Sequence, residues 1–160
     1  MASSPDDATL TPEALLRSYI ARFDPKEQKL IRAVRSALRK RLPTANELLY
    51  DYDKFFVIAY SATDHPMQGI VSTAARPDGV RLYLMSGPQL PDPKKLLQGS
   101  GKETRYICVE TASRITHPDV EALIAGAIAR ATVPLPVEGR GKLILRSVAA
   151  NRRPRKKPAK

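Results

Sequence analysis

Apolar residues near the start of the chain recur at helical spacing in two consecutive segments. The first begins at Thr11-Pro12, a capping residue followed by proline at the first helical position, and its apolar face continues to Phe23. Asp24-Pro25 ends this helix and begins a second one by the same chemistry, and Leu42-Pro43 ends the second. Four basic residues of the second helix fall largely outside its apolar stripe: Arg32, Arg35, Arg39 and Lys40.

After Pro43 the pattern changes to that of strands, with β-branched and aromatic residues and a period of two. Strands are predicted at 47–52, 55–60, 69–75, 80–85 and 104–110, with an edge strand at 142–148. The tetrapeptide 76–79 has proline and glycine where a tight turn needs them, so the third and fourth strands should form a hairpin. Asp92-Pro93 predicts a short helix that Gly99 ends, and Thr116 predicts the cap of a last helix with an apolar stripe over 120–131.

This order of elements predicts an α+β fold: an antiparallel sheet of about five strands with helices packed on one face. We expect a disordered N-terminus at 1–10 and a single domain at 11–133. A Pro/Arg/Lys-rich extension should follow at 134–160, largely disordered after 149.

The formal net charge of +11 is unevenly distributed. Residues 139–160 hold nine of the 27 basic residues and no acidic one, so residues 1–138 carry 18 basic and 16 acidic residues, a balance of +2. The basic character therefore belongs to the C-terminal tail.

The single cysteine, Cys108, cannot form an intramolecular disulfide, and its place in a strand predicts a small buried hydrophobe. No leader peptide or apolar run of membrane-spanning length is visible, so we expect a cytoplasmic protein without a membrane partner.

Several short blocks in this order resemble the YdhG-like family of small bacterial domains of unknown function. The blocks are 42–47 (LPTANE), 50–52 (YDY), 87–93 (GPQLPDP), 96–102 (LLQGSGK) and Arg105, and the similarity covers roughly 27–131. The resemblance implies an α/β sandwich. Some relatives are described as frataxin-like iron chaperones, which implies a metal-chaperone hypothesis. This chain departs from that pattern, because its second helix is basic and Asp51, Asp53 and Asp64 are scattered rather than gathered in an acidic ridge.

The loop 99–102 (Gly-Ser-Gly-Lys) has the glycines and the lysine of an anion-binding turn. It is not a nucleotide-hydrolase loop, because Leu96 and Glu103 stand where that motif needs glycine and Ser or Thr. A simple helix C-cap and turn also explains it. If the loop folds back on the preceding helix, the predicted anion site consists of Lys94, Lys95, Ser100, Lys102 and Arg105.

A second cluster, Glu47, Tyr50 and Asp51, enters the central strands, and with Tyr83 it could line a pocket between the sheet and the loop 86–93. The alternative is ordinary aromatic packing with polar tips in water. One of the two carboxylates is expected to pair with a basic residue such as Arg105.

Catalysis and metal binding have little support in the sequence. His65 and His117 have no histidine or cysteine at ligand spacing, and loop solvation and helix capping explain them better. The serines lack a nucleophile motif and Cys108 lacks an identifiable base. We therefore predict no catalytic residues, no metal site and no cofactor.

Three function hypotheses follow. The first is a non-catalytic binding module for a small anionic ligand or a protein partner. The second is a nucleic-acid-associated protein acting through its tail, whose cations neutralise phosphates without reading bases. The tail residues concerned are Arg152, Arg153, Arg155, Lys156 and Lys157. The third is an iron or metal chaperone, by family analogy.

Overall fold

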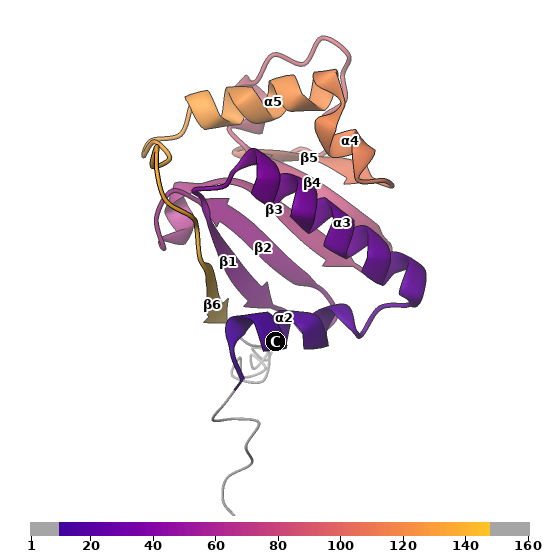
Figure 1. Cartoon of the computed structure of the whole chain (residues 1–160). Coiled ribbons are helices and arrows are strands. Elements are labelled where there is room, and N and C mark those ends of the chain that lie inside the picture. Colours follow the sequence, from indigo (N-terminus) through magenta and orange to yellow (C-terminus); the bar gives the residue numbers. More distant parts are fainter. Residues whose placement is uncertain (1–9, 148–160) are drawn as a thin grey trace, which may run out of the picture.

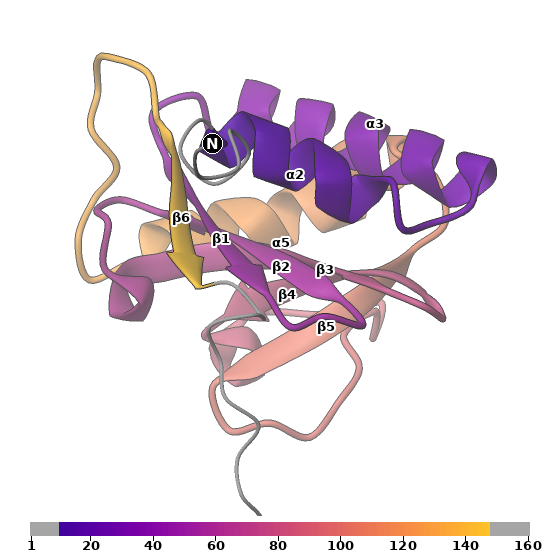
Figure 2. The same cartoon turned by 90° about the horizontal axis from the view of Figure 1, so that it is seen from below.

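A computed structural model describes residues 10–147, in which a single sheet carries the α-helices on one of its faces (Figures 1 and 2). The α-helices are α2 (Pro12–Ile20), α3 (Pro25–Arg41), α4 (Ser113–Thr116) and α5 (Pro118–Ala129). The strands are β1 (Asn46–Asp51), β2 (Phe56–Ser61), β3 (Gly69–Arg76), β4 (Gly79–Met85), β5 (Thr104–Val109) and β6 (Leu143–Ser147). Two short 3₁₀ helices, η1 (Pro66–Gln68) and η2 (Gly87–Gln89), were not predicted.

The sheet has six strands in the order β5-β4-β3-β2-β1-β6. The first five form an antiparallel meander, and the hairpin predicted at 76–79 is present because Arg76 pairs with Gly79. The α+β class is thus confirmed, and so is an edge strand near 142–148. The sheet is mixed rather than purely antiparallel, because β6 runs parallel to β1.

The predicted helix starts at Thr11 and Asp24 are confirmed. Thr11 accepts a hydrogen bond from the Ala14 N–H at 3.1 Å, and Asp24 accepts one from the Glu27 N–H at 3.0 Å. The cap predicted at Thr116 is wrong, because that residue ends the separate helix α4. His117 caps α5 instead, its Nδ1 accepting from the Asp119 N–H at 3.2 Å.

The short helix predicted after Asp92 does not form. The Asp92 carboxylate accepts hydrogen bonds from the N–H groups of Leu96 and Leu97, both at 2.8 Å, and closes a non-helical turn. Lys95 has a φ of 54°, a left-handed conformation that no α-helix continues through. The capping residue was recognised correctly, but its side chain stabilises an irregular loop.

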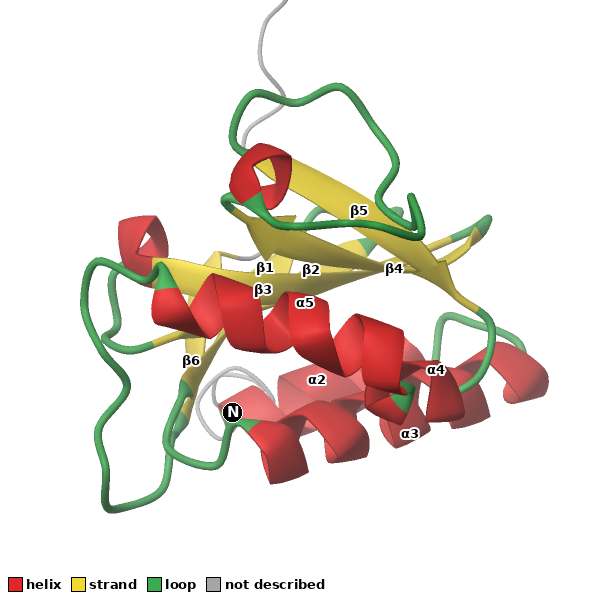
Figure 3. Cartoon of the chain, turned by 90° about the horizontal axis from the view of Figure 1, so that it is seen from above, coloured by secondary structure: helices red, strands yellow, loops and turns green. Residues whose placement is uncertain are grey.

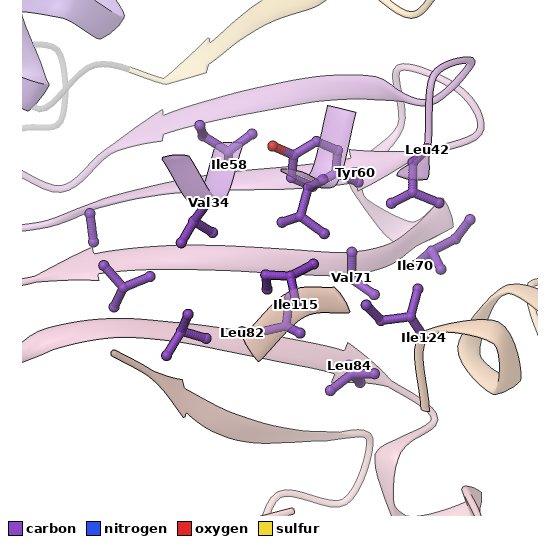
Figure 4. Packing of buried hydrophobic residues seen from close by; sticks show 14 of the residues in the cluster. Val34, Leu42, Ile58, Tyr60, Ile70, Val71, Leu82, Leu84, Ile115 and Ile124 are labelled. Carbon is purple, nitrogen blue, oxygen red and sulfur yellow. The ribbon is translucent and has the colours of Figure 1, made fainter. Parts of the chain in front are cut away.

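The core lies between the sheet and the helices, where α3 and α5 face the apolar residues of the central strands (Figures 3 and 4). Leu38, Leu82, Ile107 and Ile124 are completely inaccessible to solvent. Tyr60 is equally buried, and its hydroxyl is the polar atom visible among these apolar side chains in Figure 4. Among residues 10–147 no helix combines the length and the apolar character that a bilayer span requires.

Two of the sequence-based expectations fall outside the described residues. These are the disordered N-terminus, apart from residue 10, and the tail cations from Arg152 to Lys157.

Close backbone contact holds β6 against β1. The Gly141 N–H donates to the Pro43 carbonyl at 2.9 Å, and the Asn46 side chain accepts from the Lys142 N–H at 2.9 Å. A Cβ atom on Gly141 would lie 1.6 Å from the carbonyl oxygen of Ala45. Only glycine therefore permits this approach.

Gly141→Ala should separate the start of β6 from β1 and cost about 1–3 kcal/mol of unfolding free energy, as overpacking does elsewhere. Urea denaturation measures the loss, and hydrogen exchange should show faster exchange in β6 than in β3. Val137→Ala is the control, because Val137 is 95% exposed in the loop before β6 and its loss should change stability by no more than about 0.5 kcal/mol. Equal stability of Gly141→Ala and the unmodified protein would contradict the close approach.

Candidate functional site

Two residues of the predicted loop anion site, Lys94 and Arg105, have separate partners in the structure. Lys94 Nζ lies 3.2 Å from the Asp119 carboxylate on α5, whereas Arg105 donates to the Gly101 carbonyl at 3.1 Å. The cavity beside Lys94 has a volume of only about 60 Å³ and is lined by Asp92 and Asp119. Lys95, Ser100, Lys102 and Arg105 do not line that cavity. Two carboxylates in so small a space disfavour an anion.

The predicted pocket of Glu47, Tyr50, Asp51 and Tyr83 is divided between the two faces of the sheet. Glu47 and Asp51 are buried on the helix side, at 3% and 5% exposure, because they pair with Tyr60 and Phe56 of the core. Tyr50 and Tyr83 point to the opposite face, because successive strand residues alternate. These four residues therefore do not share one pocket.

Both carboxylates do pair with arginine, but not with the predicted Arg105, which lies on β5 with three strands between it and β1. Asp51 accepts from Arg22 at 2.8 Å. Glu47 accepts two hydrogen bonds from Arg35, at 2.9 and 2.8 Å, and one from the Tyr60 hydroxyl at 2.9 Å.

Arg35 is held by two carboxylates at once. Besides its bonds to Glu47 it donates to both oxygens of Glu13 on α2, at 3.2 and 2.9 Å. Burial alone would lower the pKa of Arg35, but its hydrogen bonds to Glu47 and Glu13 outweigh that effect and raise the pKa above its ordinary value. The same bonds lower the pKa of Glu13. Burial, followed by the charge of Glu47, raises the pKa of Tyr60 well above 10.0, so its hydroxyl stays a donor.

The Glu13–Arg35 contact forms the floor of a groove between α2 and α3, which lie side by side over the sheet (Figure 2). The groove has a volume of about 740 Å³, within the size range of small-molecule sites. One stripe of each helix lines it, joined by Pro43 and by Arg140 from the loop before β6. The lining residues are Glu13, Leu16, Arg17, Ile20, Arg32, Arg35, Ser36, Arg39, Lys40, Pro43 and Arg140.

The groove is strongly cationic. Six of its lining side chains are basic and one, Glu13, is acidic. That carboxylate is already engaged by Arg35, and Arg39 lies 3.9 Å from it and 3.8 Å from Glu47. The remaining four cations, Arg17, Arg32, Lys40 and Arg140, are exposed, and none of them makes a salt bridge within residues 10–147. Their charges therefore remain available to an anion.

Sequence reasoning noticed the basic residues of the second helix but drew no site from them. The signal is their spacing: Arg32, Arg35 and Arg39 recur at three- and four-residue intervals and so share one side of α3, and Lys40 lies beside Arg39. Arg17 on the preceding helix completes the set. Nothing in the sequence indicates that Arg140, 100 residues after Lys40, joins them.

Comparisons with protein-family models, with curated proteins and with solved structures find no match to this chain. Membership of the YdhG-like family therefore stays a hypothesis that rests on the short sequence blocks. Within residues 10–147, no group of three or more histidine, cysteine, aspartate or glutamate side chains is arranged to hold a metal ion.

Tyr60→Phe should reduce the free energy of unfolding by about 1.5–3 kcal/mol, because it removes a buried hydrogen bond to a charged group. Guanidinium denaturation measures the change. Tyr106→Phe is the matched control, because Tyr106 is half-buried and its hydroxyl makes no hydrogen bond to any of residues 10–147, so the loss should stay within about 0.5 kcal/mol. Similar losses in the two variants would argue against the Glu47–Tyr60 bond.

Acid should weaken the Glu13–Arg35 contact. The folded-state pKa of Glu13 lies below its ordinary value of 4.5, so its stabilising effect is present above pH 4.5 and disappears as the pH falls through the folded-state pKa. Glu13→Gln should therefore show a smaller acid-side loss of stability than the unmodified protein. Urea midpoints measured from neutral pH downwards would test this, and superimposable pH profiles would count against it.

Proposed function

We propose that this protein is a non-catalytic binding module for a small anionic ligand, and that the ligand binds in the groove between α2 and α3. The observation that carries the proposal is the excess of basic side chains in a groove of small-molecule size. The four cations without a salt bridge come from α2, α3 and the loop before β6, so they surround the space rather than line one wall.

The buried part of the groove supports binding by preorganisation. Arg35 uses four hydrogen bonds on Glu13 and Glu47, which fixes α2 against α3 before any ligand arrives. A rigid site loses less conformational entropy on binding than a mobile one. Leu16 and Ile20 also line the groove but are only 1% and 4% exposed, so the surface open to a ligand is mainly that of the basic side chains.

The composition of the lining favours binding over catalysis. It contains no histidine, cysteine or tyrosine, and its one hydroxyl side chain is Ser36. A serine nucleophile needs an adjacent base, and the basic groups here are arginine and lysine. The metal-chaperone hypothesis gains no support from this cationic surface, since metal cations prefer carboxylate ligands. A cytoplasmic location stays part of the proposal, in keeping with the single cysteine.

Calorimetry of the full-length protein with inorganic phosphate, pyrophosphate and AMP would test the proposal. At least one of these should bind, and Arg17→Ala/Arg32→Ala should weaken that binding about tenfold or more, because charge-assisted hydrogen bonds contribute about 1.5–3 kcal/mol each. Both residues are exposed, so the fold should survive the change.

Lys94→Ala/Lys102→Ala is the matched control, since it removes two cations from the loop before β5 and leaves the groove intact. Unchanged binding in this control places the ligand in the groove. If binding is lost in the control and kept in Arg17→Ala/Arg32→Ala, the ligand binds at the loop 94–105 and not in the groove. No binding of any probe would refute the proposal.

A further inference from the structure

The face of the sheet opposite the helices carries a connected set of aromatic rings and arginines. All four α-helices lie on the other side (Figures 2 and 3). Directly paired residues of neighbouring strands point to the same face. One row across the sheet is Tyr50, Val57, Ala74, Arg81 and Cys108, and the next is Leu48, Ala59, Ser72, Tyr83 and Tyr106. Cys108, expected to be buried, is only half-buried on this face.

The aromatic residues form two groups. Tyr52 stacks on both Tyr50 and Phe55, with ring centroids 6.4 and 4.9 Å apart. Tyr83 and Tyr106 lie 5.3 Å apart on adjacent strands. Tyr52 is 37% exposed, and the other four are half-buried with one side covered by the sheet. Ring surface is thus presented to solvent at both groups.

Arginines accompany both aromatic groups. The guanidinium of Arg76 lies 5.5 Å from the centre of the Phe55 ring, and that of Arg81 lies 4.3 Å from the centre of Tyr106. Asp78, in the β3–β4 turn, accepts from Arg76 at 3.1 Å and lies 3.7 Å from Arg81. Arg146 of β6 is close enough to Tyr50 to offset part of the rise that burial causes in the Tyr50 pKa. We call Tyr50, Tyr52, Phe55, Arg76, Arg81, Tyr83, Tyr106 and Arg146 the aromatic–arginine face.

We propose that the aromatic–arginine face binds single-stranded nucleic acid, with bases stacked on the tyrosines and phosphates bound by the arginines. Base stacking on aromatic side chains beside a positively charged surface is the usual chemistry of such sites. Tyr52, which is 37% exposed, and the half-buried rings of Tyr83 and Tyr106 supply the aromatic surface that the sequence of the basic tail lacks.

Charge favours this occupant over a second copy of the chain. A twofold contact through this face would bring the face of one copy, with Arg76, Arg81 and Arg146, against the same positively charged face of the other. One carboxylate, Asp78, contacts these arginines, so three cations would remain largely uncompensated. A polyanion instead gains from all three.

The end of β6 also favours a nucleic-acid ligand for this face. Ser147, the last residue of β6, pairs with Tyr50 of the face. The sequence that follows, 148–160, contains six basic residues and no acidic one. β6 therefore ends beside the face, and the sequence after it supplies further cations that can neutralise phosphates.

Fluorescence anisotropy of the full-length protein with labelled oligonucleotides of about 12 nucleotides would test the proposal, since single-strand sites span about 4–16 nucleotides. Oligo(U), oligo(dT) and a duplex of the same length are the three probes. We expect at least one single strand to bind more tightly than the duplex. Tyr52→Ser and Tyr83→Ala/Tyr106→Ala should each weaken single-strand binding about fivefold or more.

Tyr83→Phe/Tyr106→Phe keeps both rings and should bind the single strand as tightly as the unmodified protein does. A loss of binding seen only in the double alanine variant is then due to the missing rings. Tyr52 is exposed, so Tyr52→Ser remains informative even if the double alanine variant is unstable. Arg17→Ala/Arg32→Ala should leave oligonucleotide binding unchanged. A result that refutes nucleic-acid binding by this face can therefore be distinguished from one that refutes anion binding in the groove.

Three results would overturn the proposal. One is equal binding by the tyrosine variants and the unmodified protein, with binding lost when Arg152, Arg153 and Arg155 are changed to serine, which would assign binding to the tail alone. The second is tighter binding to the duplex than to either single strand. The third is a dimer in sedimentation that Tyr52→Ser dissociates, which would make this face a contact between copies.

Discussion

A buried carboxylate imposes the strictest constraint on this structure. Glu47 is 3% exposed, and a charge removed from water to that extent needs close partners of opposite charge. Arg35 and Arg39 of α3 supply the opposite charge, and the Tyr60 hydroxyl of β2 donates a further hydrogen bond. Arg35 in turn needs the second carboxylate, Glu13 of α2. One ionic cluster therefore fixes two helices over two strands.

The anion groove depends on this cluster. Glu13 and Arg35 bind each other, and within residues 10–147 Arg17, Arg32, Lys40 and Arg140 make no salt bridge. A buried ion pair of this kind contributes little net stability, since desolvation offsets much of the attraction. Its stronger effect is geometric: α3 must cross the sheet where Arg35 reaches Glu47, and that crossing brings Arg32 and Lys40 opposite Arg17. The cluster of Glu13, Arg35 and Glu47 thus positions the groove, and the exposed side chains around it supply the charge.

The single-layered sheet gives the molecule two unlike surfaces. On the helix side the arginines contact carboxylates or remain unpaired around a concave site. On the other side Arg76 and Arg81 lie over aromatic rings on an exposed strand surface. Alternation along the strands enforces this separation, because neighbouring residues such as Tyr50 and Asp51 must point to opposite faces. That alternation is also why the four-residue pocket expected from sequence could not form.

The sequence by itself determined the elements whose signals are local. Caps at Thr11 and Asp24, the turn at 76–79 and the strand periodicity each depend on a few adjacent residues, and the structure contains all of them. Local signals failed at 92–98, where Lys95 adopts a left-handed conformation, and at the cap of α5. Only the tertiary structure decided that β6 runs parallel to β1, that Glu47 pairs with Arg35 rather than Arg105, and that Arg140 joins the groove. These are contacts between distant segments, and they follow from burying every apolar face at once, a condition that no short stretch of sequence encodes.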